Sequence, residues 1–186
     1  MNAVIHASLL GLILATCSSH TNPQTIAAVI EHESGSHPWA IHDNTDGKPH
    51  YPQTYADAVR LAERLNAEGH SIDMGLGQIN NSNLSWLHAT IPQIFIPCNN
   101  VWAADTILCS SWKTVVHNIG RIALFEPDRY AYRMLGIYHS NSMNDPRYEN
   151  AVVPLATGSF VRRTVMYYHW WKQRGVHPVV HGGCHV

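Results

Sequence analysis

The sequence predicts a mainly α domain that carries one small β or loop region. Several segments place apolar residues at helical spacing between recognisable helix starts and stops. Two stretches, Ile41 to Gln53 and Gly69 to Asn80, break that pattern with turn-forming residues. The length of 186 residues suits a single domain with a short appendage. Any small sheet must therefore come from the two stretches that break the helical pattern.

The first well-marked helix begins at Asn22, a capping residue, and has Pro23 at its first helical position. It ends at Gly35, because glycine is the preferred residue just beyond a helix. A second helix is predicted over 54–68 and stops at Gly69. Its inward positions are Ala58, Leu61 and Leu65.

Four further helices are predicted from the same signals. The first begins near Ser82, and the next covers 100–112 after Asn99 as its cap. The last two cover 128–138 and 159–174. The helix near Ser82 carries Leu84, Leu87 and His88, and the helix over 100–112 turns Ala104, Ile107 and Leu108 inward.

The two ends of the chain differ from its middle. Residues 1–16 contain an apolar run, Ala7 to Ala15, that is too short to span a bilayer. This run is either the core of a signal peptide or the first helix of the domain, and the absence of a preceding Lys or Arg favours the helix. We expect residues 17–175 to form the domain and the Gly- and His-rich residues 176–186 to form a flexible tail.

Composition excludes several classes of partner. Charged residues make up 13% of the chain and the net charge is −1, so a nucleic acid is not expected as a partner. No segment predicts stable membrane insertion. The four cysteines form no C-x-x-C pair and suit one or two disulfides in an oxidising compartment. Three complete pairings are possible, and spacing does not choose among them.

The fourteen histidines do not form a recognisable metal site. His32-Glu33 lacks the second histidine four residues on that a zinc protease needs, because Ser36 stands there. His181, Cys184 and His185 lie in the expected tail, where nothing would orient metal ligands. We therefore predict no metal.

One glutamate stands out as a candidate catalytic acid. Ile26, Val29 and Ile30 mark the apolar stripe of the first helix, and Glu33 follows them at helical spacing. Glu31 lies about 140° from Ile26 around the helix, so we expect it in solvent. A carboxyl group at the end of an apolar stripe is a candidate for a raised pKa and for general acid catalysis. The alternative is a structural glutamate bonded to a nearby loop.

A glycine-rich stretch, Gly75 to Asn80, offers a second candidate site. Glycines allow the backbone to approach a ligand closely, and the amides of Gln78 and Asn80 suit hydroxyl and acetamido groups. A tight turn without a ligand is the alternative. The stretch has no following Lys, so it is not a phosphate-binding loop.

In order along the chain, these pieces resemble the motifs of the soluble lytic transglycosylases, in the branch found in type IV secretion and conjugation systems. The matching blocks are Glu33-Ser34-Gly35 with Pro38 and Ala40-Ile41, continued by His42-Asp43-Asn44-Thr45, then Gly69-His70-Ser71-Ile72-Asp73, Gly75 to Asn80, Pro97-Cys98-Asn99-Asn100, Tyr138 to Asn141 and Phe160 to Val165. The sequence departs from the family at Gly77, which replaces a methionine, at His139 and Asn141, and at Phe160, which replaces a tyrosine. These departures concern the positioning of substrate more than the acid.

The resemblance implies a lysozyme-like α+β fold, with a helical domain and a small β or loop lobe flanking a glycan cleft. It implies cleavage of the β-1,4 bond between N-acetylmuramic acid and N-acetylglucosamine in the periplasm, with 1,6-anhydro ends and without metal or cofactor. Glu33 would be the acid and then the base, with peptidoglycan strands and secretion-apparatus proteins as partners. The substrate contacts would be Ser34, Gln78, Asn80, Tyr138 and Phe160, the last packed close to the cleft. The branch also implies a disulfide between Cys17 and Cys98.

Two other functions fit the same motifs. A lysozyme-type hydrolase would use Asp43 or Asp73 as a second carboxylate. A non-catalytic wall-binding or scaffold protein of the same apparatus would keep the fold without turnover, and the three departures favour it. Digestion of cell wall followed by mass spectrometry separates these functions.

Overall fold

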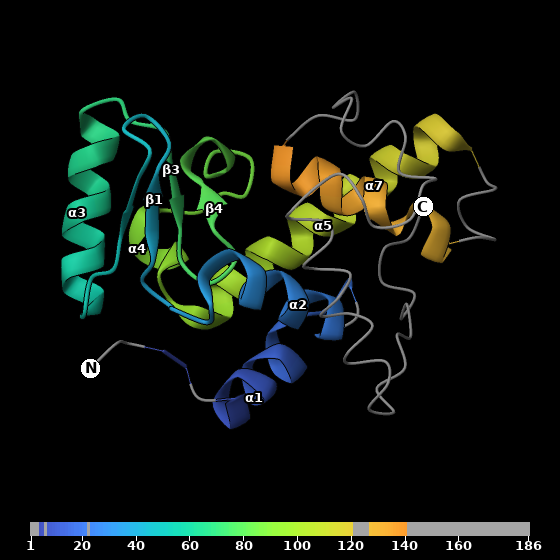
Figure 1. The fold of residues 1–186 in the computed structure, drawn as a ribbon, viewed down its shortest axis with the longest axis horizontal. Helices are drawn as coiled ribbons and strands as arrows, with labels where there is room; N and C mark the ends of the chain where they lie inside the picture. The colour runs from blue at the N-terminus through green and yellow to red at the C-terminus, as the bar shows by residue number, and fades with distance from the viewer. Residues whose placement is uncertain (1–3, 6, 22, 121–126, 141–186) are drawn as a thin grey trace. The chain divides into compact units, whose positions relative to one another are not determined.

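The computed structural model describes residues 4–5, 7–21, 23–120 and 127–140 (Figure 1). The chain divides into two compact units. The first unit comprises Met1–Ser19 and Val29–Ala104, and the second comprises His20–Ala28 and Asp105–Val186. Each unit is described by itself.

The first unit contains a four-stranded antiparallel sheet built from the two stretches that break the helical pattern. Its strands are β1 (Ile41–Asp43), β2 (Lys48–His50), β3 (Ile72–Met74) and β4 (Ile79–Asn80), in the order β2-β1-β3-β4. The predicted mainly helical fold with a small β or loop region is confirmed, and the structure shows that this region is an antiparallel sheet.

The register of the sheet separates an apolar face from a polar one. Ile41 lies opposite Met74, and both side chains are buried. On the alternate positions, His42 lies opposite Asp73, and Asp73 lies opposite Asn80 of β4. Because successive side chains of a strand point to opposite faces, the sheet places these polar side chains together.

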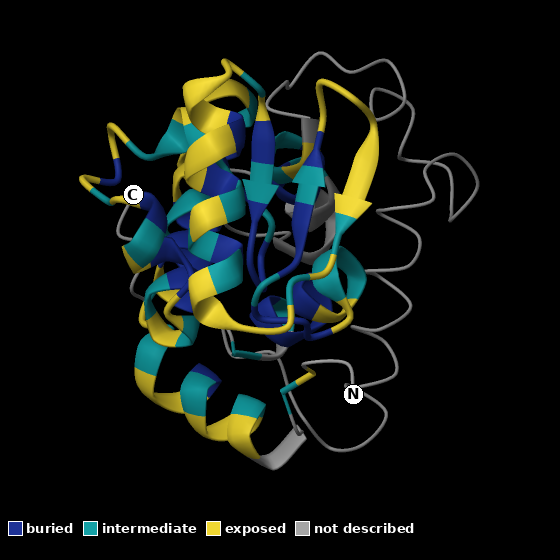
Figure 2. Ribbon diagram, turned by 90° about the vertical axis from the view of Figure 1, so that its left-hand side faces the viewer, coloured by how far each residue is buried: buried dark blue, intermediate teal, exposed yellow. Residues whose placement is uncertain are grey.

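Helix α3 (Tyr55–Ala67) packs against β1 and β3, with its outer face exposed to solvent (Figure 2). Thr54 caps its first turn by accepting a hydrogen bond from the amide of Asp57 at 3.1 Å, as expected for a threonine before a helix. Ala58, Ala62 and Leu65 are its buried residues, so Ala62 takes the central inward position that we expected for Leu61.

Two helices contribute residues to both units. Helix α2 (Pro23–Ser34) has the predicted bounds to within a residue. Helix α5 (Pro97–Ile119) begins earlier and runs further than the predicted 100–112. Pro97 supplies the preset backbone of a first helical position. Asn99 is therefore inside the helix, where its side chain donates to the carbonyl of Gln93 instead of capping.

The helix predicted near Ser82 is wrong. The segment forms only a short 3-10 helix, η1 (Asn81–Asn83), followed after a turn by α4 (Ile91–Ile94). Polar side chains compete with the helical hydrogen bonds here, since Asn80 Oδ1 accepts from the amide of Ser82. His88 has a positive φ of 50°, which a continuous helix does not allow.

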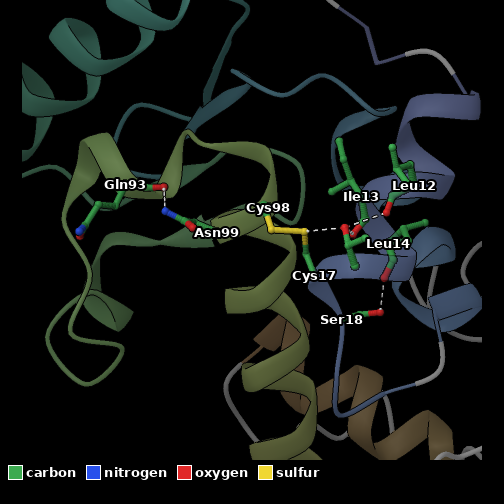
Figure 3. The surroundings of a disulfide bond; sticks show 9 residues. Leu12, Ile13, Leu14, Cys17, Ser18, Gln93, Cys98 and Asn99 are labelled. Atoms are coloured by element: carbon green, nitrogen blue, oxygen red, sulfur yellow. Dashed lines mark hydrogen bonds between the residues drawn. A yellow bond between two sulfur atoms is a disulfide. The ribbon is translucent and has the colours of Figure 1, made fainter.

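Residues before α2 form a further helix, α1 (Ala7–Cys17). The helix that the sequence favours over a signal peptide is thus present, but only part of its apolar surface is buried, since Leu14 is buried whereas Leu9 and Leu12 are exposed. A disulfide joins Cys17 to Cys98 in the first turn of α5, with Cα atoms 5.4 Å apart (Figure 3). In the described part of the chain, no helix combines the length and the hydropathy needed to cross a membrane.

The second unit contains the later part of α5 and α7 (Pro127–Ser140), which includes the predicted 128–138. Its buried residues include Leu108, Val115, Met134 and Leu135. Buried Asp105 accepts hydrogen bonds from the backbone amides of His20 and Thr21, both at 2.7 Å. The predicted helix over 159–174 and the tail over 176–186 lie outside the described residues.

Candidate functional site

Glu33 is the next-to-last residue of α2, and it follows the apolar stripe predicted from the sequence. Ile26, Val29 and Ile30 are fully buried. Glu31 is exposed, and its carboxylate accepts a hydrogen bond from Ser36 Oγ at 3.1 Å. The helix therefore separates the two glutamates into one half-buried and one solvated group.

The environment of Glu33 favours its protonated form. Desolvation by burial, reinforced by the negative charge of Asp73, raises the pKa of Glu33 from its ordinary 4.5 to about 8. The residue as a whole is only partly exposed to solvent. At neutral pH the group is therefore a carboxylic acid that holds a proton it can deliver.

Asp73, on β3, is held in place by two amides. Asn44 donates to Oδ2 at 2.8 Å, and Asn80 of β4 donates to Oδ1 at 2.7 Å. These two donors hold in place the carboxylate whose negative charge acts on Glu33. The sequence points to Asp73 and Asn80 as candidate site residues but gives Asn44 no role beyond its place in a motif, because only the sheet brings the three side chains together.

Asp43 has a structural role. Its side chain is buried, accepts hydrogen bonds from the amides of Thr45 and Asp46, and contacts Nδ1 of His70 at 2.8 Å. Burial alone would raise the pKa of Asp43, but the bonds from His70 and the two amides outweigh it and hold that pKa below its ordinary value. The same bond raises the pKa of His70. Asp43 therefore ties the β1–β2 turn to the segment before β3.

Asp43, Asp46 and His70 are the only group of three potential metal ligands that the described residues bring together, within 4.8 Å of one another. Asp43 and His70 already bond to each other, and Asp46 is exposed beside Lys48. These contacts satisfy the group through the protein's own side chains, and we assign it a structural role.

The glycine-rich stretch forms a tight turn between β3 and β4. The amide of Gly75 donates to the carbonyl of Ala40 at 2.8 Å, and the amide of Gln78 donates to the carbonyl of Gly75 at 3.2 Å. Gln78 has a positive φ of 50°, and Gly75 has a φ of 74°. The turn therefore lies directly beside the segment that follows Glu33 in the chain.

The carboxamide of Gln78 folds back onto its own turn. Nε2 donates to the carbonyl of Gly75 at 2.8 Å and to that of Ala40 at 3.2 Å. Both hydrogens of the amide are thus used, and only Oε1 is left to meet a ligand. The sequence suggested an amide that both donates and accepts, whereas the folded side chain is an acceptor.

The other predicted contacts differ in how far the structure describes them. Ser34 donates its hydroxyl back to the carbonyl of Ile30 at 3.2 Å. Asn80 also donates to Ser71 Oγ at 3.1 Å, so its side chain supports the loop as well as Asp73. Tyr138 lies half-buried on α7, in the second unit. Phe160 lies outside the described residues.

His37, just after α2, is a buried histidine with an unusual environment. Its Nδ1 accepts from the amide of Trp39 at 3.3 Å, and its ring meets the edge of Tyr51 with centroids 5.5 Å apart. Nε2 is the only buried side-chain polar atom without a partner among the described residues. Desolvation lowers the pKa of His37, so the ring is neutral at physiological pH.

Curated relatives are similar to about half of this chain. The chain is 38% identical over 97 residues to Protein virB1 of Agrobacterium fabrum. The aligned region covers 52% of this chain and 39% of the Agrobacterium protein. It is also 32% identical over 106 residues to the Type IV secretion system protein virB1 of Brucella abortus biovar 1. That aligned region covers 56% of this chain and 44% of the Brucella protein. The chain thus spans less than half the length of these relatives. No solved structure matches it significantly.

The family comparison covers all the described site residues of the first unit. The model of the transglycosylase SLT domain matches residues 12–125, which is more than half of the chain and includes Glu33, Asp73 and Gln78. The sequence motifs, the fold and this match agree, and the chain belongs to the transglycosylase SLT domain family.

Proposed function

We propose that this protein is a peptidoglycan lytic transglycosylase that uses Glu33 as its single acid and base. The observation that carries the proposal is a half-buried glutamate at the end of α2 whose raised pKa keeps it protonated at neutral pH. Membership of the transglycosylase SLT domain family supports the reaction class.

The proposed reaction has two proton transfers through Glu33. First the protonated carboxyl delivers its proton to the bridging oxygen of N-acetylglucosamine as the bond from C1 of N-acetylmuramic acid breaks. The resulting carboxylate then takes the proton of the muramyl C6 hydroxyl, whose oxygen bonds to C1. The glycan gains a 1,6-anhydro end, no water is consumed, and Glu33 returns to its acid form.

The second candidate function is a lysozyme-type hydrolase with Asp73 as the second carboxylate. It is favoured by the negative charge of Asp73 acting on Glu33, an arrangement that resembles the carboxylate pair of glycosidases. Asp43 does not fit this role, because it is buried and bonded to His70. In this alternative, water would attack C1 in place of the C6 hydroxyl.

The setting is also part of the proposal. Two relatives are named as VirB1 proteins, one of them a type IV secretion system protein. We infer that this chain opens the wall locally for a secretion or conjugation apparatus, in the periplasm, with glycan strands and apparatus proteins as its partners. The disulfide between Cys17 and Cys98 supports an oxidising compartment.

The deciding experiment is a digest of purified cell wall followed by mass spectrometry of the released muropeptides. Lytic cleavage produces ends that are one water lighter than hydrolysed ends. Glu33→Gln keeps the shape of the side chain but cannot transfer a proton, so muropeptide release should fall by at least about 10²-fold. The matched control, Glu31→Gln on the exposed side of α2, should stay near wild type.

Each outcome of the digest selects one function. Anhydro ends support the transglycosylase, and hydrolysed ends select the hydrolase. Binding of the wall without any release would select the non-catalytic scaffold. Full activity of Glu33→Gln would overturn both enzymatic mechanisms.

A further inference from the structure

Asn100 is a fully buried polar side chain that no catalytic step uses. It lies in the first turn of α5, and its residue is 1% exposed. Its Oδ1 accepts from the amide of Gly77 at 2.7 Å, while its Nδ2 donates to the carbonyls of Met74 and Ile94 at 2.9 and 3.0 Å. One side chain thus joins β3, the glycine turn and the end of α4.

These three bonds bracket the turn that carries Gln78. Met74 immediately precedes the turn, and Gly77 lies within it. Between them, the carbonyl of Gly75 accepts from both the amide and Nε2 of Gln78. Opening the turn would break the bonds to Asn100. This is unfavourable, because a buried amide is costly to leave unpaired.

The close fit of Asn100 also explains the residue at position 75. A Cβ atom on Gly75 would collide with Nδ2 and Cγ of Asn100. The positive φ of Gly75 disfavours any other residue for a second reason. Asn100 therefore lies directly against the backbone of the turn.

The result is a carboxamide with a single orientation. Both hydrogens of Gln78 Nε2 point to carbonyls, so the assignment of nitrogen and oxygen follows from the bonds themselves. Oε1 has no hydrogen-bond partner among the described residues, and Gln78 is only partly buried. An outward carbonyl oxygen recognises only hydrogen-bond donors.

We propose that Asn100 is a positioning residue that locks the carboxamide of Gln78 with Oε1 outward, as an acceptor for an N–H or O–H group of the glycan. The identity of the ligand rests on the proposed function, whereas the locking of the side chain does not. Asn100 acts through Gln78 and does not itself touch the substrate.

The first test measures the locking without any substrate. In the wild type, the Nε2 hydrogens of Gln78 should exchange slowly with water, as followed by NMR and assigned through their loss in Gln78→Ala. Asn100→Asp keeps the acceptor for Gly77 but removes both donated hydrogens, and this exchange should become at least about tenfold faster. Asn99→Ala, which removes a side chain that donates to the carbonyl of Gln93 outside the turn, is the matched control and should leave the exchange unchanged.

The second test is a double-mutant cycle of glycan affinity in the Glu33→Gln background, with soluble strands prepared from peptidoglycan. Asn100→Asp should weaken binding by about tenfold when Gln78 is present and by no further factor when Gln78 is alanine. A merely structural role would produce the same loss in both backgrounds.

The outcomes separate this inference from the proposed function. Unchanged exchange in Asn100→Asp overturns the locking, whatever the enzyme does. If the Nε2 hydrogens exchange faster in Asn100→Asp but the loss of glycan affinity is the same with and without Gln78, the acceptor role is overturned. A wild-type protein that locks Gln78 but releases no muropeptides counts against the proposed function alone. Asn100→Ala serves as a second variant if Asn100→Asp fails to fold.

Discussion

At the scale of single residues, Glu33 links catalysis to stability. Its pKa is about 8 in the folded protein and near 4.5 in an unfolded chain. Below pH 4.5 both states hold the proton. Between pH 4.5 and 8 the unfolded chain releases it while the folded protein retains it, so the wild type loses stability as pH rises through this window.

Glu33→Gln removes this pH-dependent loss. We expect the variant to be more stable than the wild type by about 1–3 kcal/mol at pH 9, and equally stable at pH 4. Urea unfolding at the two pH values measures the difference. Glu31→Gln, on the exposed side of the helix, should track the wild type at both. A gain of Glu33→Gln that is the same at pH 4 and pH 9 would show that burial does not disfavour the charge of Glu33.

Asp73 supplies the other residue-scale prediction. Asp73→Asn removes a negative charge beside Glu33, so the pKa of Glu33 should fall. The activity should then decline at a lower pH than in the wild type, while activity near pH 6 is largely retained. The pH profile of muropeptide release measures this. Asp46→Asn, an exposed acid of the same sheet region, is the control.

The same variant distinguishes the two enzymatic mechanisms. If Asp73 is the second carboxylate of a hydrolase, Asp73→Asn should lose about 10²–10⁴-fold of the rate at every pH. A shift of the profile without such a loss is the result expected for the transglycosylase.

At the scale of elements, the glycine turn predicts a contrast between two glycines. Gly75→Ala would place an alanine at a positive φ and drive its Cβ atom into Asn100. We expect the free energy of unfolding to fall by about 2–4 kcal/mol. Gly69→Ala also requires a positive φ but meets nothing within 4 Å, so it should cost about 1–2 kcal/mol. Equal losses in chemical denaturation would show that Asn100 does not press against the turn.

Local sequence signals predict an element correctly where its bounds and its buried face depend on its own residues. The bounds of α2, the cap of α3 and the apolar stripe leading to Glu33 can be predicted from the sequence, because they depend on local residues and on helical spacing. The helix expected near Ser82 failed, since side chains such as Asn80 bond to the backbone there. The start of α5 was missed because Asn99 resembles a cap, whereas Pro97 is the true first position.

The candidate site was readable only in part. Glu33 and Gln78 were found from spacing and from a family motif. The support of Asp73 by Asn44 requires the register of the sheet, which joins residues 29 positions apart. The acceptor-only character of Gln78 depends on the carbonyl of Ala40, which is 38 positions away. Such long-range bonds leave no periodic trace in the sequence.

At the scale of the whole molecule, the disulfide between Cys17 and Cys98 connects α1 to the first turn of α5 (Figure 3). Cys109 is disulfide-bonded too, and Cys184 lies outside the described residues. The first bond closes a loop across a sequence separation of 81, and this should stabilise the fold by about 4–5 kcal/mol in the chain-entropy model.

Peptide mapping of exported protein without reductant should recover Cys17 linked to Cys98. Cys17→Ser and Cys98→Ser should lower the free energy of unfolding by similar amounts, and the double variant by no more than either. A lipidated Cys17 or a bridge between Cys98 and Cys109 would contradict this pairing.

The disulfide also has a consequence for proteolysis. Glu33, Asp73 and Gln78 all lie between the two linked cysteines, inside one covalent ring. The turn between β1 and β2 is exposed and belongs to this ring, so it is a natural place for a protease to cut. A single cut there opens the ring, but the disulfide still joins the two pieces. The nicked protein would keep its mass, apart from one added water, until a reductant divides it into two fragments.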